Sequence, residues 1–124
     1  MIKIKHLMDP VEKDDGPRLW VEPMGLTKDL REWCQVEHLL THLGPPMKLW
    51  RWFEAHPDGF SSFRGQYHEH LSRSKYRNAL RELAGAGLRS TFTLLHTGDD
   101  AEHNSAVALY EYLIELQSYC SNEE

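Results

Sequence analysis

Hydrophobic and polar residues alternate at the start of the chain, and a second short apolar run follows. Isoleucine alternates with lysine over residues 2–5, with His6 next in the series, which is the period-2 pattern of a strand with one buried face. The polar stretch that ends in Asp15-Gly16-Pro17 has turn chemistry. Residues 18–21, Arg-Leu-Trp-Val, are rich in aromatic and β-branched side chains. The pattern predicts two strands joined by a loop.

Apolar residues at helical spacing occupy the middle of the chain. The first stripe begins after Thr27, a residue type that favours the N-cap, and reaches Leu43, where Gly44-Pro45-Pro46 would end a helix. Three shorter stripes predict further helices over residues 49–53, 60–71 and 76–84. We expect Gly85 or Gly87 to cap the last of them.

The most strand-like run of the chain lies near its end and is followed by one more helix. Residues 91–95, Thr-Phe-Thr-Leu-Leu, have the character of a strand that is covered on both faces. An apolar stripe over residues 106–116 predicts the final helix. Three strands separated by helices predict a single α/β domain over residues 1–120, with a small, mostly parallel sheet and helices packed on it. We expect residues 121–124 to form a flexible tail.

Composition and charge narrow the classes of function. The hydrophobic share is 40% and the charged share is 27%, as in an ordinary globular protein. A net charge of −5 argues against nucleic acid as a partner, because binding phosphates requires a basic face. No apolar run approaches the roughly 18 residues of a membrane span. Cys34 and Cys120 lack CxxC spacing, which favours a reducing compartment, and we expect a cytoplasmic protein.

Polar residues follow two of the predicted strands at the point where each strand ends. Glu22 comes directly after the second strand, and the segment from His96 to Asn104 follows the last strand. Ligands of open α/β sheets bind at the carboxyl ends of the strands. If the two strands are parallel neighbours, Glu22 and this segment share one edge of the sheet, where a small-molecule ligand would bind.

Two residues of this segment are candidate catalytic groups. We expect Asp99 or Asp100 to cap the final helix, with Glu102 in its first turn. His103 and Asn104 then lie in the same turn, where a side chain can point back toward the strand ends. Histidine titrates near neutral pH, so His103 could act as an acid or base, with Asn104 orienting it or a substrate.

Two other kinds of ligand fit the same segment: a divalent metal ion and an anion. His96, Asp100 and His103 could offer nitrogen and oxygen ligands to a divalent metal, although their spacing matches no known zinc signature. An anion at the helix N-terminus would need a cation from elsewhere, since Asp99 and Asp100 repel it, and Arg18 is the nearest candidate.

The first predicted helix carries a second possible metal site. His38 and His42 would lie one turn apart on the predicted helix, but they lack the internal glutamate of the HExxH motif. The chain has neither a P-loop nor a dinucleotide-binding fingerprint, and nothing in the sequence defines a cofactor or an oligomeric state.

Short motifs spread over nearly the whole chain occur in an order that is typical of a known family. They are Ile2-Lys3-Ile4-Lys5, Asp9-Pro10, Asp15-Gly16 with Arg18, Pro23-Met24-Gly25-Leu26, Leu49-Trp50-Arg51-Trp52-Phe53, His56-Pro57, Phe63-Arg64, Tyr67, Thr93-Leu94-Leu95, Glu102-His103-Asn104 and Ala106. In this order they resemble the YeaO-like branch of the domain-of-unknown-function 488 family. The resemblance implies an α/β fold and a bacterial protein, and it carries no known activity.

The chain departs from that family where a site would lie. Family members typically have Asp-Arg-Leu-Trp-Pro-Arg-Gly after the second strand, where this chain has Glu22-Pro23-Met24-Gly25. They usually have a basic and then an acidic residue before the His-Asn pair, where this chain has Asp99-Asp100. A pocket that is cationic in relatives would therefore be acidic or neutral here. Two functions follow: a binding or regulatory domain with a divergent site, or a small-molecule or metal-dependent enzyme that uses His103 and Asn104.

Overall fold

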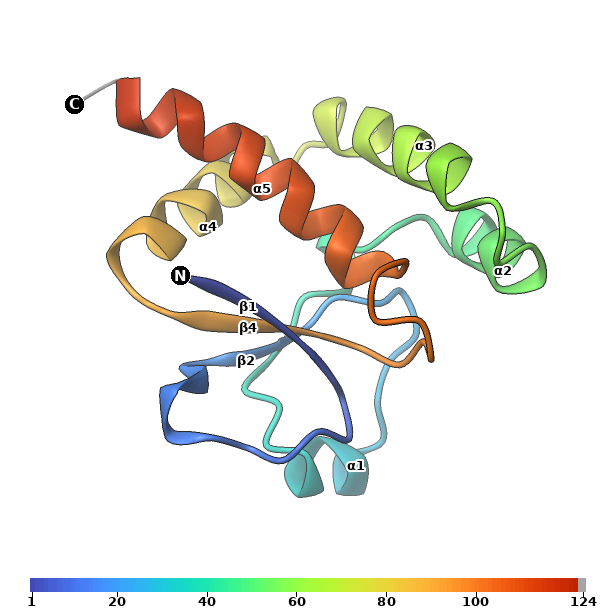
Figure 1. The fold of residues 1–124 in the computed structure, drawn as a ribbon, viewed down its shortest axis with the longest axis vertical. Helices are drawn as coiled ribbons and strands as arrows, with labels where there is room; N and C mark the ends of the chain where they lie inside the picture. The colour runs from blue at the N-terminus through green and yellow to red at the C-terminus, as the bar shows by residue number, and fades with distance from the viewer. Residues whose placement is uncertain (123–124) are drawn as a thin grey trace.

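The structure is a computed structural model that describes residues 1–122, in which strands and helices form a layered α/β domain (Figure 1). The strands are β1 (Ile2–His6), β2 (Arg18–Trp20), β3 (His38–Leu39) and β4 (Phe92–His96). The helices are α1 (Lys28–Trp33), α2 (Met47–Ala55), α3 (Phe60–Ser72), α4 (Arg77–Arg89) and α5 (Ser105–Asn122). Short 3-10 turns, η1 (Lys13–Asp15) and η2 (Thr41–Leu43), precede β2 and α2. The predicted α/β fold with helices packed on a parallel sheet is confirmed.

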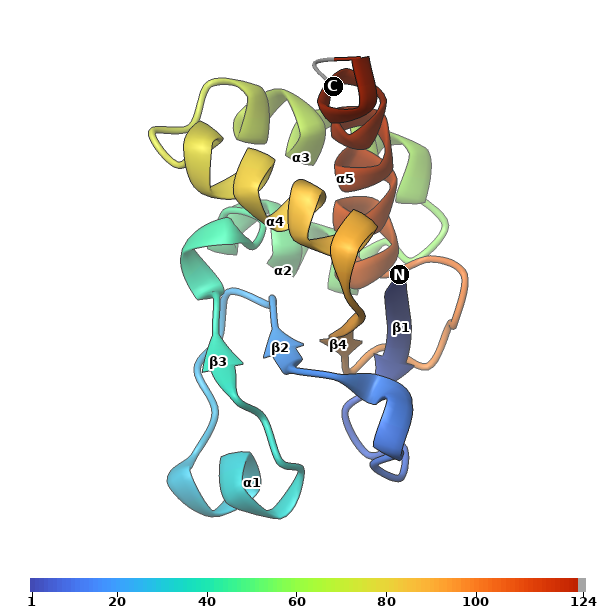
Figure 2. The ribbon, with the colours of Figure 1, turned by 90° about the vertical axis from the view of Figure 1, so that its left-hand side faces the viewer.

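The four strands form one parallel sheet in the order β1-β4-β2-β3. Thr93 of β4 lies opposite Lys3 of β1 on one side and opposite Arg18 of β2 on the other. Helices α2, α3, α4 and α5 lie on one face of this sheet, and α1 lies on the other (Figures 1 and 2). The carboxyl ends of β2 and β4 are therefore neighbours.

Two hydrophobic clusters fill the space on either side of the sheet. All five residues of β4 are buried, and because successive side chains of a strand point to opposite faces, Leu94 packs with the helical layer while Leu95 packs with the α1 side. The larger cluster includes Phe63 of α3 and Leu109 of α5. The prediction that this strand is covered on both faces is confirmed.

The predicted helix from Thr27 to Leu43 is wrong beyond its first two turns. Thr27 does cap α1, and its hydroxyl accepts the N–H of Leu30, but the helix ends at Trp33, and Gln35 has a positive φ of 52°. The chain then pairs with β2 as a fourth strand, β3, with the N–H of Leu40 bonded to the carbonyl of Trp20 at 2.7 Å. Pairing with the sheet overrides the helical spacing of the apolar residues.

The predicted glycine cap of α4 is also wrong, because the helix continues to Arg89. Gly85 and Gly87 are buried within it. A Cβ at Gly87 would lie 2.7 Å from Cγ1 of Ile2, so this glycine allows α4 to approach β1. Close packing, and not helix termination, accounts for it.

The end of the chain is helical as far as the structure describes it. Helix α5 runs to Asn122 and so includes Ser121 and Asn122 of the expected tail, while residues 123–124 lie outside the described residues. No helix within residues 1–122 has the length and apolar character needed to cross a bilayer.

Candidate functional site

The ends of β2 and β4 meet through a buried carboxylate. Glu22 follows β2 by two residues and is only 2% exposed. Its Oε1 accepts the backbone N–H of Thr97 at 3.0 Å and the hydroxyl of Thr97 at 3.4 Å. Its Oε2 accepts the indole N–H of Trp50 at 2.7 Å. The structure thus brings Glu22 into direct contact with the segment that follows β4.

The surroundings of Glu22 favour its protonated form. Burial raises the pKa of the Glu22 carboxyl most strongly, and the nearby charge of Glu54 acts in the same direction. Hydrogen bonds from Thr97 and Trp50 oppose this effect without cancelling it, so the pKa stays above its ordinary value. Both carboxylate oxygens already have donors from the chain itself. Glu22 therefore connects strand ends and the helical layer.

A histidine–carboxylate pair lies in the exposed part of the loop over residues 97–104. His103 Nδ1 lies 2.8 Å from Asp100 Oδ2, and Asp100 Oδ1 accepts the backbone N–H groups of Glu102 and His103. The hydrogen bond from His103 is the main reason that the pKa of Asp100 is lowered. The ring of His103 also meets Phe60 of α3 edge-on at 5.0 Å. The loop thereby holds the imidazole in one orientation at the surface.

Asn104 is the N-cap of α5. Its Oδ1 accepts the N–H of Val107 at 2.9 Å, and its Nδ2 donates to the carbonyl of Asp100 at 2.9 Å. The expectation that Asp99 or Asp100 caps this helix is wrong, because α5 begins only at Ser105. Asn104 is 3% exposed, so its polar atoms are used in holding the loop against the helix.

His96 is buried at the end of β4 beside His6. The two rings lie edge-on with centroids 5.5 Å apart, and Nδ1 of His96 has no hydrogen-bond partner among the described residues. Burial, and then the proximity of His6, lower the pKa of His96 from its ordinary value, which favours the neutral ring. A buried ring nitrogen without a partner can accept or donate one bond to a ligand or water.

Arg18 lies away from this site, at the start of β2. Its side chain is 2% exposed, and its NH1 contacts Asp15 Oδ2 at 2.9 Å. Its Nε donates to the carbonyl of Cys34, and its NH2 donates to the carbonyls of Leu7 and Asp9. All three guanidinium nitrogens are bonded within the chain, two of them to Asp15 and to the segment that follows β1, so Arg18 is engaged by the protein itself and not set out as an anion partner.

Asp15 is the centre of a buried ionic cluster on that side of the sheet. Besides Arg18, it contacts Lys3 at 2.7 Å and Lys5 at 3.0 Å. Burial alone would raise the pKa of Asp15, but hydrogen bonds from Lys3, the backbone of Glu12, Lys5 and Arg18 hold it well below its usual range. The cluster ties the β1–β2 connection to the strands.

Of the predicted metal ligands, Asp100 and His103 come together, but they are not joined by a third. Among the side chains that the structure describes, residues 1–119, no three His, Cys, Asp or Glu are arranged to hold a metal ion. The set of His96, Asp100 and His103 is therefore not assembled as a metal centre. His38 lies in β3 and His42 in η2, so the helical spacing expected for this pair does not occur.

Trp50 and Thr97 are the members of the site that the sequence did not reveal. A tryptophan on an amphipathic helix usually indicates core packing, and only the folded chain shows that its indole N–H points at Glu22. Thr97 contributes mainly its backbone N–H, which no residue pattern reports. In the sequence, only the position of Glu22 at the end of a predicted strand indicated this site.

The fold and these strand ends define a small parallel α/β domain with a polar edge of the type that binds ligands in other α/β proteins. The family description "Inactive DUF488-N3 subclade" matches residues 1–123, and the chain belongs to this subclade. It is similar to the uncharacterized protein YeaO of Escherichia coli (strain K12), with 27% identity over 121 residues, covering 93% of this chain and 98% of the relative. No solved structure matches the chain. The resemblance to the YeaO-like DUF488 branch is confirmed.

Proposed function

We propose that this chain is a non-catalytic, cytoplasmic binding domain that takes a small polar ligand at its strand ends. The binding surface would consist of the loop over residues 97–104 together with His96 and the edge around Glu22. The description of the subclade as inactive supports binding without turnover.

The observation that carries the proposal is the state of Glu22. A catalytic carboxylate has to exchange a proton or contact the reacting atoms, whereas both oxygens of Glu22 accept hydrogen bonds from Thr97 and Trp50. The carboxylate is 2% exposed, so a substrate would have to displace these donors to reach it. Glu22 thus acts as a fixed support beneath a binding surface.

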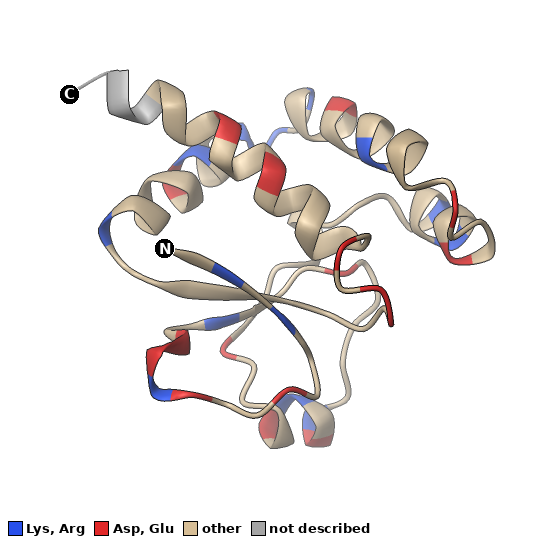
Figure 3. Cartoon of the chain, viewed as in Figure 1, with Lys and Arg blue, Asp and Glu red and all other residues tan. Residues whose placement is uncertain are grey.

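The charge around the strand ends indicates what kind of ligand fits. Asp99, Asp100 and Glu102 make the loop before α5 acidic (Figure 3), and Arg18 is engaged elsewhere. An anion would be repelled. A cationic or neutral polar molecule is therefore the ligand class that the surface favours.

A small-molecule enzyme is the second candidate function, and the His103–Asp100 pair favours it. A carboxylate that binds Nδ1 of a histidine leaves Nε2 to act as a base, and the observed separation of 2.8 Å suits this role. Asn104 would not take part, because both of its polar atoms serve the helix cap and the loop.

The test is an NMR titration of the ¹⁵N-labelled chain with three probes: spermidine as the cation, glucose as the neutral molecule and citrate as the anion. We expect saturable shifts at the amides of residues 97–104 with spermidine or glucose, and none with citrate. The variant Asp100→Asn should weaken spermidine binding. Glu115→Gln, the matched loss of an exposed carboxylate on α5, should not.

Two outcomes would overturn the proposal. Preferential binding of citrate would contradict the charge argument, and unchanged loop amides with both spermidine and glucose would contradict the location of the site.

A further inference from the structure

A groove along α2 and α3 is lined by residues that differ from those of the strand-end site, although Trp50 of α2 belongs to that site. One part of it, of about 340 Å³, has an apolar floor of Leu49 and Trp52 and is bordered by Pro46, Lys48 and Gln66. A second part, of about 390 Å³, continues past Gln66 along α3. Gln66 borders both parts, so they are neighbours on the same surface.

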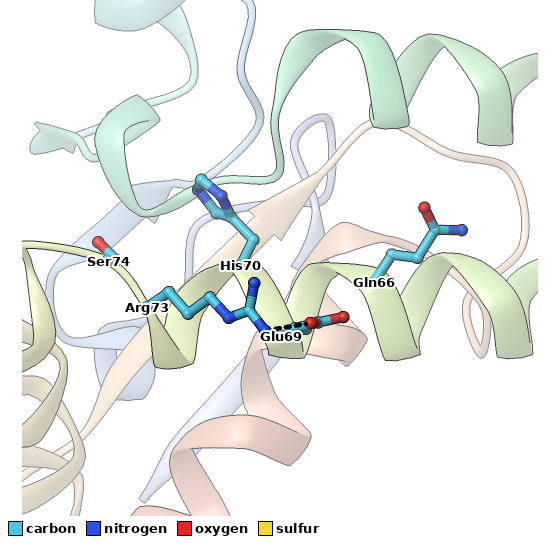
Figure 4. Close-up of a pocket in the computed structure, with 5 residues that line it drawn as sticks. All are labelled: Gln66, Glu69, His70, Arg73 and Ser74. Atoms are coloured by element: carbon cyan, nitrogen blue, oxygen red, sulfur yellow. Dashed lines mark ion pairs between the residues drawn. The ribbon is translucent and has the colours of Figure 1, made fainter.

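The second part of the groove is lined by polar and basic side chains. Its walls include His70 and Arg73, with Glu69 and Ser74 beside them (Figure 4). Arg73 pairs with Glu69 at 2.9 Å, and both side chains are largely exposed. An exposed pair of this type contributes little to stability, so an incoming carboxylate can replace Glu69 as the partner of Arg73 at little energetic cost.

Charge is strongly segregated along this chain. Residues 46–90 contain eight Lys and Arg against four Asp and Glu, a net charge of +4, while the rest of the chain has six against fifteen, a net charge of −9. The blue positions of α2, α3 and α4 show the basic part in Figure 3. The groove therefore lies in the basic region of an otherwise acidic protein.

From this geometry we infer that the groove is a docking site for an acidic peptide segment of a partner protein. An apolar side chain of the segment packs on Leu49 and Trp52, and its carboxylates pair with Lys48 and Arg73. The acidic remainder of the domain repels the same segment, which directs it to this face. The inference is independent of the strand-end ligand, because no residue is shared between the two surfaces.

The probe that tests this inference is a fluorescein-labelled peptide of about twelve residues that carries glutamates around a central Leu-Phe pair. Binding is measured by fluorescence anisotropy, and the contact is located by amide shifts of the ¹⁵N-labelled chain. The groove variant is Lys48→Glu with Arg73→Glu. Its matched control is Lys13→Glu with Lys28→Glu, which changes the net charge equally at exposed positions elsewhere.

We expect shifts confined to α2 and the C-terminal half of α3, and at least about a tenfold loss of affinity in the groove variant. The control variant should bind nearly as the parent does, and a peptide with glutamine in place of glutamate should bind far more weakly. An equal loss in the control would overturn the inference, since only net charge would then matter. Tighter binding of single-stranded poly-uridine on this face, self-association of the chain through it, or the absence of groove shifts would also overturn it.

Discussion

The Glu22 carboxylate accepts the backbone N–H of Thr97 at 3.0 Å across 75 residues of sequence. This bond joins the ends of the neighbouring parallel strands β2 and β4, and the bond from Trp50 adds α2 to the same carboxylate. Three distant segments therefore depend on one buried acid. A carboxylate in this position supports the strand ends, and it is poorly placed to transfer protons to a ligand.

The first prediction concerns the indole donor. Trp50→Phe should lower the free energy of unfolding at pH 7 by about 1–3 kcal/mol, because it leaves one buried oxygen of Glu22 without a donor. Trp52→Phe is the control, since it makes the same chemical change on the same helix at a partly exposed side chain. Urea unfolding measures both. Equal losses in the two variants would show that the indole bond to Glu22 contributes nothing.

The second prediction is a pH dependence that Glu22 causes. Because the folded-state pKa of Glu22 is raised above its ordinary 4.5, the native state binds more protons than the unfolded state between these two values. Stability from this group is therefore greatest at acid pH and falls as pH rises through the window. Unfolding curves recorded at a series of pH values above 4.5 should show that Glu22→Gln lacks the fall in the free energy of unfolding that Glu22 causes in the parent. An identical pH profile in parent and variant would contradict the raised pKa.

The third prediction concerns the ionic cluster around Asp15. Asp15→Asn should lower the free energy of unfolding by about 3–5 kcal/mol, because it leaves Arg18 buried without a counter-charge. Asp14→Asn changes the neighbouring acid, which also pairs with Lys3 but is 81% exposed, and it should leave stability almost unchanged.

The same cluster also has a pH signature with the opposite sign to that of Glu22. Since the pKa of Asp15 lies below its ordinary 3.8, its contribution is present above that value and is lost only as pH falls through the folded-state pKa. Acid unfolding of Asp15→Asn should therefore lack the loss of stability that protonation of Asp15 causes in the parent.

The fourth prediction tests the role of Asn104. Asn104→Ala should lower the free energy of unfolding by about 1 kcal/mol, since it removes the cap of α5. Asn104→Asp keeps an oxygen for the N–H of Val107 but loses the bond from Nδ2 to the carbonyl of Asp100, so it should restore only part of the loss. Thermal unfolding of both variants measures the difference. An alanine variant as stable as the parent would mean that this side chain is kept for something other than the cap.

Much of the fold was predictable because local pattern and tertiary environment agree. The alternation over residues 2–5 and the apolar run before His96 both lie where the sheet requires them. The stretch after Trp33 was not predictable, because its backbone hydrogen bonds go to β2, a partner that helical spacing cannot reveal. The proximity of Glu22 to residue 97 was predicted only on the condition that the two strands are parallel neighbours, and the sheet order meets that condition.

The site was less predictable than the fold, for a physical reason. Asn104 resembled a site residue, because the sequence offered Asp99 and Asp100 as equally good caps for α5. Only the path of the loop shows that the helix begins several residues later, at Ser105. Arg18 has the chemistry of an anion ligand, but its burial beside Asp15 is a property of the folded β1–β2 connection.

The most direct test of binding without turnover is to follow the probe itself. Proton NMR spectra of spermidine and of glucose are recorded over one day with the wild-type chain, at concentrations where the amides of residues 97–104 are shifted. We expect the loop amides to stay shifted and the probe spectrum to remain unchanged. Conversion of either probe to a new compound, abolished in His103→Ala, would contradict binding without turnover and identify His103 as catalytic.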